Sequence, residues 1–189
     1  KEGFYLSMRD EEYKLLKKIY NQPHTTLAGN AIFALGIVTG DNSTYLSDEP
    51  VEGWEPVLLG KDIEKYHISK SHKYIKYEPN KLQQVAPEHI YRAEEKLVYR
   101  FIGDRLRFAY DNSGMLTLNS CNIVIPSIAG MDIRYILAVL NSSVADYIYK
   151  RHYKSLKVLR THIESIPIPI VKEEQQKKVV NMIEAIYIS

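Results

Sequence analysis

The sequence predicts an α+β fold in which a sheet-rich middle lies between helices. Apolar residues recur at helical spacing near both ends of the chain, and short β-leaning runs separated by Gly, Asn, Asp and Pro fill the region between them. The 189 residues are 45% hydrophobic and 25% charged, as expected for a folded globular protein. We therefore expect one domain, or two small lobes, over residues 1–170 and a separate helix over residues 171–189.

The first predicted element is a helix over residues 8–21. Ser7 and Asp10 have the spacing of a capping box, apolar residues follow at helical intervals, and Pro23 ends the pattern. The second predicted element is a buried strand at residues 31–38, because this run contains no polar side chain.

Residues 31–126 form the predicted sheet-rich middle. Within it, residues 106–118 are expected to form a hairpin around the turn at residues 111–114, where Gly114 can adopt the positive φ that such turns require. The short β-leaning runs that follow the first strand are Val57–Leu59, Tyr74–Tyr77, Leu97–Ile102, Leu106–Tyr110, Met115–Leu118 and Asn122–Ile125.

Two helices are predicted after the sheet. Asp132 is a plausible N-cap, and the apolar spacing that follows it predicts one long helix over residues 132–151. The Ile166–Pro169 segment must be extended, because each proline removes a backbone donor and restricts the residue before it. The last apolar stripe reaches the end of the chain without a stop signal, so we expect this helix to continue in a longer parent protein.

Positive charge is concentrated in the middle of the chain, although the net charge is only +2. Residues 65–162 contain 16 basic and 8 acidic side chains, and residues 150–162 contain no acid. In residues 61–81, lysines alternate with tyrosines. Both patterns suit a polyanion such as nucleic acid, and both are also compatible with a solvated helix end or strand face.

Catalytic and metal-binding patterns are weak. The sequence contains neither the glycine-rich turn of a methyl-donor site nor the Pro-Pro-aromatic motif that accompanies a flipped base, and Glu94–Lys96 is a poor nuclease signature. The single cysteine, Cys121, and the spacing of His67 and His72 do not make a zinc site. We expect no catalytic residue, cofactor or metal in this chain, no membrane partner, and a cytoplasmic location.

An ordered series of segments resembles the TaqI-like C-terminal specificity domain of adenine-specific DNA methyltransferases and combined restriction-methylation enzymes. The resemblance covers roughly residues 32–188, and it departs from the family pattern at Ser43-Thr44, where a basic residue is expected. The matching segments are Gly36–Asn42, Leu58–Tyr66, Lys96–Arg100, Tyr110-Asp111, Tyr135–Ser142, Ile166–Pro169 and Glu174–Gln176.

The resemblance implies that residues 1–170 are a target-recognition domain that holds duplex DNA while a methyltransferase core flips an adenine. The implied parent is an N6-adenine DNA methyltransferase, with or without endonuclease activity. S-adenosylmethionine, with Mg²⁺ as a further candidate, would be its cofactor. The partners would be duplex DNA and a methyltransferase core in the same chain, or separate modification subunits.

The DNA-binding candidates come from the two basic regions and the family-like segments. Arg100 is the candidate for reading guanine, since arginine can contact guanine O6 and N7 together, but a structural ion pair is an open alternative. The complete set is Thr39, Asn42, Lys61, Lys65, Lys70, Lys73, Arg100, Lys150, Arg151, Lys154, Lys157 and Arg160.

Three alternatives remain open at this point. The chain could be one half of a type I restriction specificity subunit, whose helices dock modification subunits. It could instead be a protein-interaction module that uses the apolar stripes at residues 133–148 and 179–187. A stand-alone nuclease has only Glu94–Lys96 in its favour.

Overall fold

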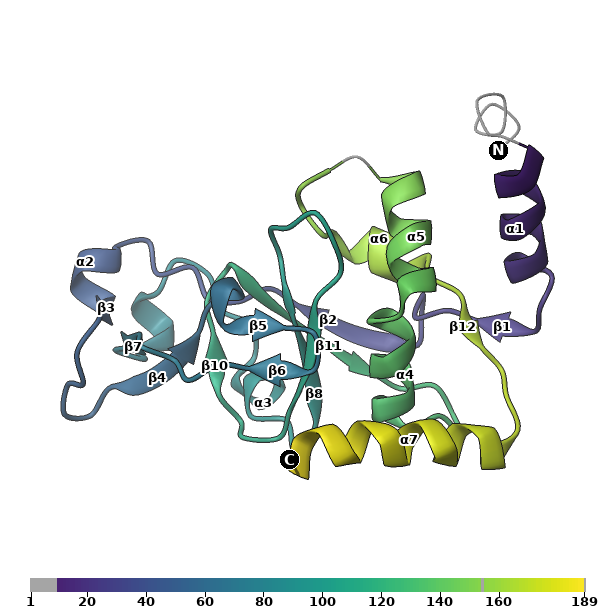
Figure 1. Ribbon diagram of the computed structural model, residues 1–189. Coiled ribbons are helices and arrows are strands. Elements are labelled where there is room, and N and C mark those ends of the chain that lie inside the picture. The colour runs from purple at the N-terminus through teal and green to yellow at the C-terminus, as the bar shows by residue number, and fades with distance from the viewer. Residues whose placement is uncertain (1–9, 154, 189) are drawn as a thin grey trace.

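The computed structural model describes residues 10–153 and 155–188 and confirms the α+β class (Figure 1). The Ser7 half of the predicted capping box lies outside the described residues. The helices are α1 (Asp10–Tyr20), α2 (Asn42–Tyr45), α3 (Glu88–Tyr91), α4 (Ile133–Leu140), α5 (Ser143–His152), α6 (Arg160–Glu164) and α7 (Glu173–Ile188), with 3-10 turns η2 (Gly60–Asp62) and η3 (Pro79–Lys81). The strands are β1 (His24–Thr25), β2 (Ala31–Ala34), β3 (Leu46–Ser47), β4 (Glu55–Leu58), β5 (Ile63–Glu64), β6 (His67–Ile68), β7 (Tyr74–Ile75), β8 (Lys96–Arg100), β9 (Phe108–Asp111), β10 (Leu116–Thr117), β11 (Cys121–Pro126) and β12 (Ile168–Pro169).

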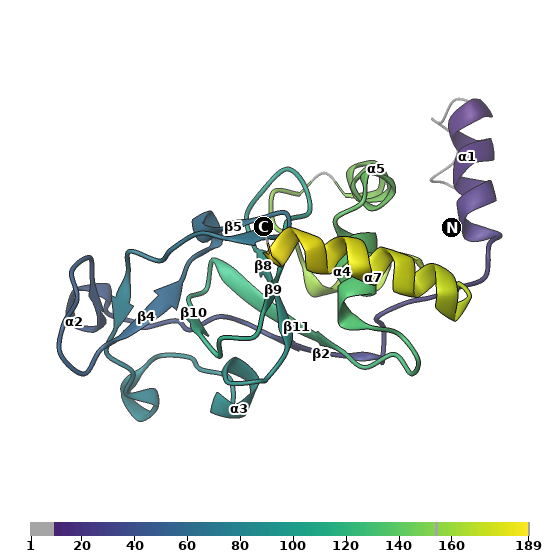
Figure 2. The ribbon, with the colours of Figure 1, turned by 60° about the horizontal axis from the view of Figure 1, so that its bottom comes forward.

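The centre of the fold is an antiparallel sheet with strand order β2-β11-β8-β9. Successive side chains of β8 point to opposite faces of the sheet. Leu97 and Tyr99 therefore belong to the first core, under the helices, and Val98 belongs to the second core, on the other face. The helices α4, α5 and α7 lie on the face of the sheet that carries the first core (Figures 1 and 2). The sheet therefore separates a helical part from a part made of short strands and loops.

The predicted hairpin over residues 106–118 is wrong, although its turn forms. Gly114 has a φ of +68°, and Asp111 accepts a 2.9 Å hydrogen bond from the Ser113 amide. Beyond the turn, however, β10 leaves the central sheet and pairs in parallel with β4, while β9 pairs with β8. Leu116 is buried in the second core, which accounts for this change of partner.

The predicted buried strand at residues 31–38 is also wrong in length and burial. Only β2 is a strand, it lies at the sheet edge, and Ile32 and Leu35 are 50% and 52% exposed. The chain leaves the sheet at Gly36 and passes very close to the backbone of Leu118. Only glycine fits there, because a Cβ would lie 2.0 Å from the Leu118 carbonyl oxygen. Ile37, the next residue, is fully buried in the second core.

The predicted long helix over residues 132–151 is interrupted between α4 and α5. Asp132 caps α4 as expected, by accepting a bond from the Arg134 amide. Asn141 then turns its side chain to the sheet and binds both the amide and the carbonyl of Phe108, at 3.0 and 2.9 Å. Ser142 then caps α5 by accepting a hydrogen bond from the Ala145 amide. Because polar contacts make the break, hydrophobic periodicity alone could not reveal it.

The proline-rich connector is extended as predicted and pairs with β1. Ile166 and Ile168 are buried in the first core, whereas Ile170 is 55% exposed, so only two of the three isoleucines share the apolar face. The helix α7 follows and packs across α4 (Figure 1). Over the described ranges, every helix is too short or too polar to cross a bilayer.

Candidate nucleic-acid interface

A polar groove of about 760 Å³ lies in the loop-rich part of the molecule, beside α2. It collects residues from segments that are distant in the sequence but adjacent in the fold. The polar residues that line it include Thr39, Asn42, Ser43, Asp48, Lys73, Gln83, Asn119 and Ser120.

The segment at residues 37–42 forms the middle of this groove. On one side, the Asn119 amide donates to the Ile37 carbonyl at 3.0 Å. On the other side, the Gln83 amide donates to the Thr39 carbonyl at 3.3 Å, and Val38 and Gln84 exchange two backbone bonds. These bonds fix three loops in one arrangement, as expected of a binding surface formed by loops on a rigid sheet.

The beginning of α2 orders the polar end of the groove. Thr39 is buried and donates from its hydroxyl to Asn42 Oδ1 at 2.5 Å. Asp41 caps α2, and hydrogen bonds from Ser43 and Thr44 lower the pKa of its carboxyl to about 2. Ser43 and Thr44, where the family pattern led us to expect a basic residue, therefore serve here to hold the Asp41 carboxylate.

Lys73 lines the groove, and Lys61 lies in an adjoining hollow. Lys73 Nζ lies 2.5 Å from the carboxylate of the exposed Asp48, and this contact lowers the pKa of Asp48. Lys61 lines a smaller hollow of about 200 Å³ that shares Ser120 with the groove. Gly60 packs directly on Ser120, the residue that the two hollows share: a Cβ at Gly60 would lie 2.3 Å from the Ser120 carbonyl oxygen.

Arg100 and Lys65, both predicted DNA-binding residues, have protein partners. Arg100 Nε donates to the Gly60 carbonyl at 2.8 Å, and Nη2 contacts the Lys61 carbonyl and the Glu64 carboxylate. Lys65 Nζ donates to Asp146 and to the Asn141 carbonyl. The prediction that Arg100 reads guanine stays a prediction, but part of its guanidinium is already used.

The basic loop, defined as residues 155–160, runs beside the segment that follows Arg100. The Gly103 amide donates to the Leu156 carbonyl and the Val158 amide donates to the Phe101 carbonyl, both at 2.8 Å. The bridge between Lys157 and Ile102 brings the loop next to the hollow that contains Lys61, and the loop carries Lys157 and Arg160.

The other predicted cations differ in how far they are free to bind. Arg160 pairs with Glu164 at 2.7 Å and its guanidinium lies 5.1 Å from the ring centre of Phe33. Arg151 pairs with Glu12 and stacks on Tyr147. Lys70 and Lys150 are exposed, while Lys154 lies outside the described residues.

Gln83, Asn119, Asp48 and Ser120 line the groove but were missed by the sequence reasoning. Gln83 and Asn119 lie in unrelated loops, and neither belongs to a charge run or a family-like segment. The one available signal was the Gly36–Asn42 segment, since a glycine-rich turn often permits close backbone approach. It identified the middle of the groove and not its flanks.

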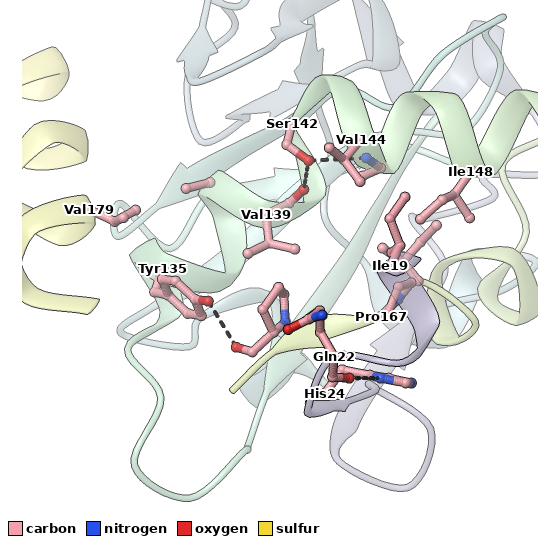
Figure 3. A pocket seen from close by; sticks show the side chains of 14 residues that line it. Ile19, Gln22, His24, Tyr135, Val139, Ser142, Val144, Ile148, Pro167 and Val179 are labelled. Carbon is pink, nitrogen blue, oxygen red and sulfur yellow. Dashed lines mark hydrogen bonds between the residues drawn. The ribbon is translucent and has the colours of Figure 1, made fainter. Parts of the chain in front are cut away.

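A second hollow is apolar and has a different character. It has a volume of about 320 Å³ and lies between α1, the α4–α5 break and the proline-rich connector (Figure 3). Figure 3 shows Val139 and Ile148 facing Ile19 and Pro167 across it. It offers no cationic side chain, so we exclude it from the nucleic-acid interface. In residues 10–153 and 155–188, no three His, Cys, Asp or Glu side chains gather as metal ligands.

The fold is similar to that of solved chains from restriction-modification systems. One similar structure is a chain of a type I R-M system, with a TM-score of 0.58, 15% identity, and coverage of 92% of this chain and 42% of that one. Another is the HsdS subunit from Thermoanaerobacter tengcongensis, with a TM-score of 0.53, 16% identity, and coverage of 94% and 44%. These identities support a likeness of fold alone.

The chain belongs to the family of TaqI-like C-terminal specificity domains, which it matches over residues 55–168. A further relative is the type II methyltransferase M.VspI of Vibrio sp. (strain 343), 37% identical over 60 residues. That alignment covers 32% of this chain and 15% of the methyltransferase, so the chain spans a small part of this relative and less than half of the similar structures. The chain is therefore a target-recognition domain of restriction-modification systems.

Proposed function

We propose that this chain binds duplex DNA through the polar groove and the adjoining basic loop, and that it selects the target sequence of a DNA methyltransferase. The observation that carries the proposal is a groove whose lining combines Lys73 with the neutral polar side chains of Gln83 and Asn119, next to a smaller hollow lined by Lys61. Cations at a border can hold phosphates, while neutral donors and acceptors inside can contact base edges.

The basic loop supports the same assignment. Backbone bonds join it to residues 101–103, and Lys157 pairs with Ile102, which lines the hollow that contains Lys61. A surface of this kind follows the backbone of a duplex and gives an affinity that depends on salt. Non-specific binding by such surfaces has a Kd on the order of 10⁻⁴ to 10⁻⁶ M at physiological salt.

The parent protein, in this proposal, is an adenine-specific type II methyltransferase, with or without an endonuclease. The family and the relative M.VspI favour this class. S-adenosylmethionine would be bound by the methyltransferase core, and the residues of this chain would hold and orient the duplex. Catalysis is assigned to that core and not to this chain.

A second candidate parent is a type I specificity subunit that contains two such domains. The likeness to the type I chains favours it, because this chain accounts for 42% and 44% of their lengths. The two candidates agree on what the groove does. They differ in whether methyltransferase sequence lies in the same chain or in a separate subunit.

The function is tested by comparing two double variants that remove the same charge. Lys61→Ala with Lys73→Ala removes the cations at the groove, and Lys177→Ala with Lys178→Ala removes two exposed lysines of α7, each paired to a glutamate one turn away. Fluorescence anisotropy with a labelled duplex should show weaker binding for the first variant and unchanged binding for the second. Equal loss in both would mean that net charge alone governs binding, and no binding by the wild type would reject the function.

A further inference from the structure

We infer that the polar groove reads adenine through the side-chain amides of Gln83 and Asn119, an inference that rests on the proposed function. A target-recognition domain needs groups that distinguish base pairs, and the cations at the border cannot do this when they bind phosphates. The groups inside the groove therefore decide which base is preferred. Among them, these two amides are placed and left free in the way that base reading requires.

Backbone hydrogen bonds hold Gln83 and Asn119 on opposite sides of residues 37–42. The backbone N–H of Gln83 donates to the Thr39 carbonyl, and the backbone N–H of Asn119 donates to the Ile37 carbonyl. These bonds leave both side chains free. Gly40 has a φ of +79°, and a Cβ added there would lie 3.1 Å from the Gln83 Cβ and 3.3 Å from its Oε1. A glycine at position 40 thus leaves room for the Gln83 side chain.

The side-chain amides of Gln83 and Asn119 are not used to hold the groove together. Both residues are exposed, and within the described residues neither side chain has a hydrogen-bond partner. Other groups that line the groove are occupied: Asn42 Oδ1 accepts from Thr39, and Lys73 is paired with Asp48. The two free amides are consequently available to a ligand.

The chemistry of a carboxamide selects adenine. An amide presents one acceptor and one donor side by side, which match the N6 amino group and N7 of adenine in the major groove. Reading guanine in the same way requires two donors, as on arginine, and the guanidinium of Arg100 already donates to Gly60 and Glu64. The groove is therefore expected to prefer A·T pairs at the positions that these amides reach.

The test selects bound duplexes from a randomised pool with the full chain and four variants. Gln83→Ala and Asn119→Ala remove the proposed reading groups. Gln84→Ala and Asn112→Ala are matched controls, because both are exposed and neither lines the groove. The wild type should enrich A·T pairs at fixed positions, and each reading variant should reduce discrimination at its own position by roughly 5- to 150-fold, with both controls unchanged.

A second measurement addresses the atoms involved. Replacing the selected adenine by 7-deazaadenine removes the N7 acceptor, so it should weaken binding of the wild type and have no further effect on the variant that lost the matching amide. A pool without A·T preference, or reading variants that match their controls, overturns the inference while leaving duplex binding intact. Failure of the wild type to bind any duplex rejects the proposed function as well.

Discussion

Lys65 Nζ donates to Asp146 Oδ2 across 2.6 Å, which ties the turn after β5 to the first turn of α5. The same ammonium donates to the Asn141 carbonyl at 2.7 Å, and Asp146 accepts from the Leu106 amide at 3.0 Å. A lysine that the sequence suggested for DNA contact thus joins three parts of the fold at the interruption between α4 and α5.

Lys65→Met is expected to destabilise the protein by about 1–3 kcal/mol, because it leaves the half-buried Asp146 carboxylate without its cationic partner. Urea unfolding measures this change. Lys70→Met is the matched control, since Lys70 is exposed, and it should leave stability unchanged while slightly weakening DNA binding. If Lys65→Met folds with wild-type stability and loses DNA affinity, Lys65 belongs to the interface.

Asp48→Asn is expected to strengthen DNA binding. The Asp48 carboxylate is exposed, neutralises Lys73 and repels phosphates, so its removal frees one cation at the groove. The magnitude of the slope of log K against log salt should rise by up to about one unit. Glu49→Gln removes the same charge at the adjacent exposed position and should have the smaller effect, and the reverse ranking would place the groove away from the phosphates.

Arg100→Met separates the two roles open to this residue. Its bonds to Gly60, Lys61 and Glu64 predict a loss of stability of about 1–3 kcal/mol and equally weakened binding to every duplex. Arg105→Met is the control, because Arg105 is more exposed and its ion pair with Asp104, at 3.6 Å, is the only one it makes among the described residues. A selective loss on the preferred sequence, with folding intact, would instead support guanine reading.

The stability of the protein is expected to depend on pH through His162. Burial lowers its pKa below the ordinary value of 6.5, and Nδ1 accepts a bond from the Leu159 amide at 3.3 Å, which requires an unprotonated Nδ1. The unfolded chain therefore binds the proton more readily, so this stabilisation is complete above pH 6.5 and is lost as the pH falls through the lower folded value.

The measurement is urea unfolding of His162→Gln and wild type between about pH 7.5 and 5. The stability difference between the two proteins should shrink on acidification, by at most about 1.4 kcal/mol per pH unit, since one proton is involved. His67→Gln, at an exposed histidine, is the control and should run parallel to the wild type. A constant difference for His162→Gln would show that His162 keeps the same charge in both states.

The sequence predicted the class of the fold and several elements closely. The N-terminal helix, the strands β8 and β11, the extended connector and the last helix follow from spacing and from proline, which are local properties. The hairpin and the unbroken helix were wrong because tertiary bonds decided them. Leu116 is drawn into the second core, and Asn141 binds Phe108 across the sheet.

The site was predictable in its cations and not in its shape. Lys61 and Lys73 belong to a visible lysine-rich region, but charge patterning cannot show that Lys65 and Arg100 turn toward protein partners. Gln83 and Asn119 reach the groove only because two separate loops bond to opposite sides of residues 37–42. Pairing across such distances is a property of the folded chain.

Binding of the DNA backbone by the groove and the basic loop is best measured as the affinity for one duplex across a range of salt. If about 4–6 phosphates are neutralised, log K should fall against log salt with a slope of roughly −4 to −5. Lys157→Ala should reduce the magnitude of this slope by about one unit. A flat response between about 50 and 200 mM salt would rule out this mode of binding, because it would mean that no phosphate is held by these cations.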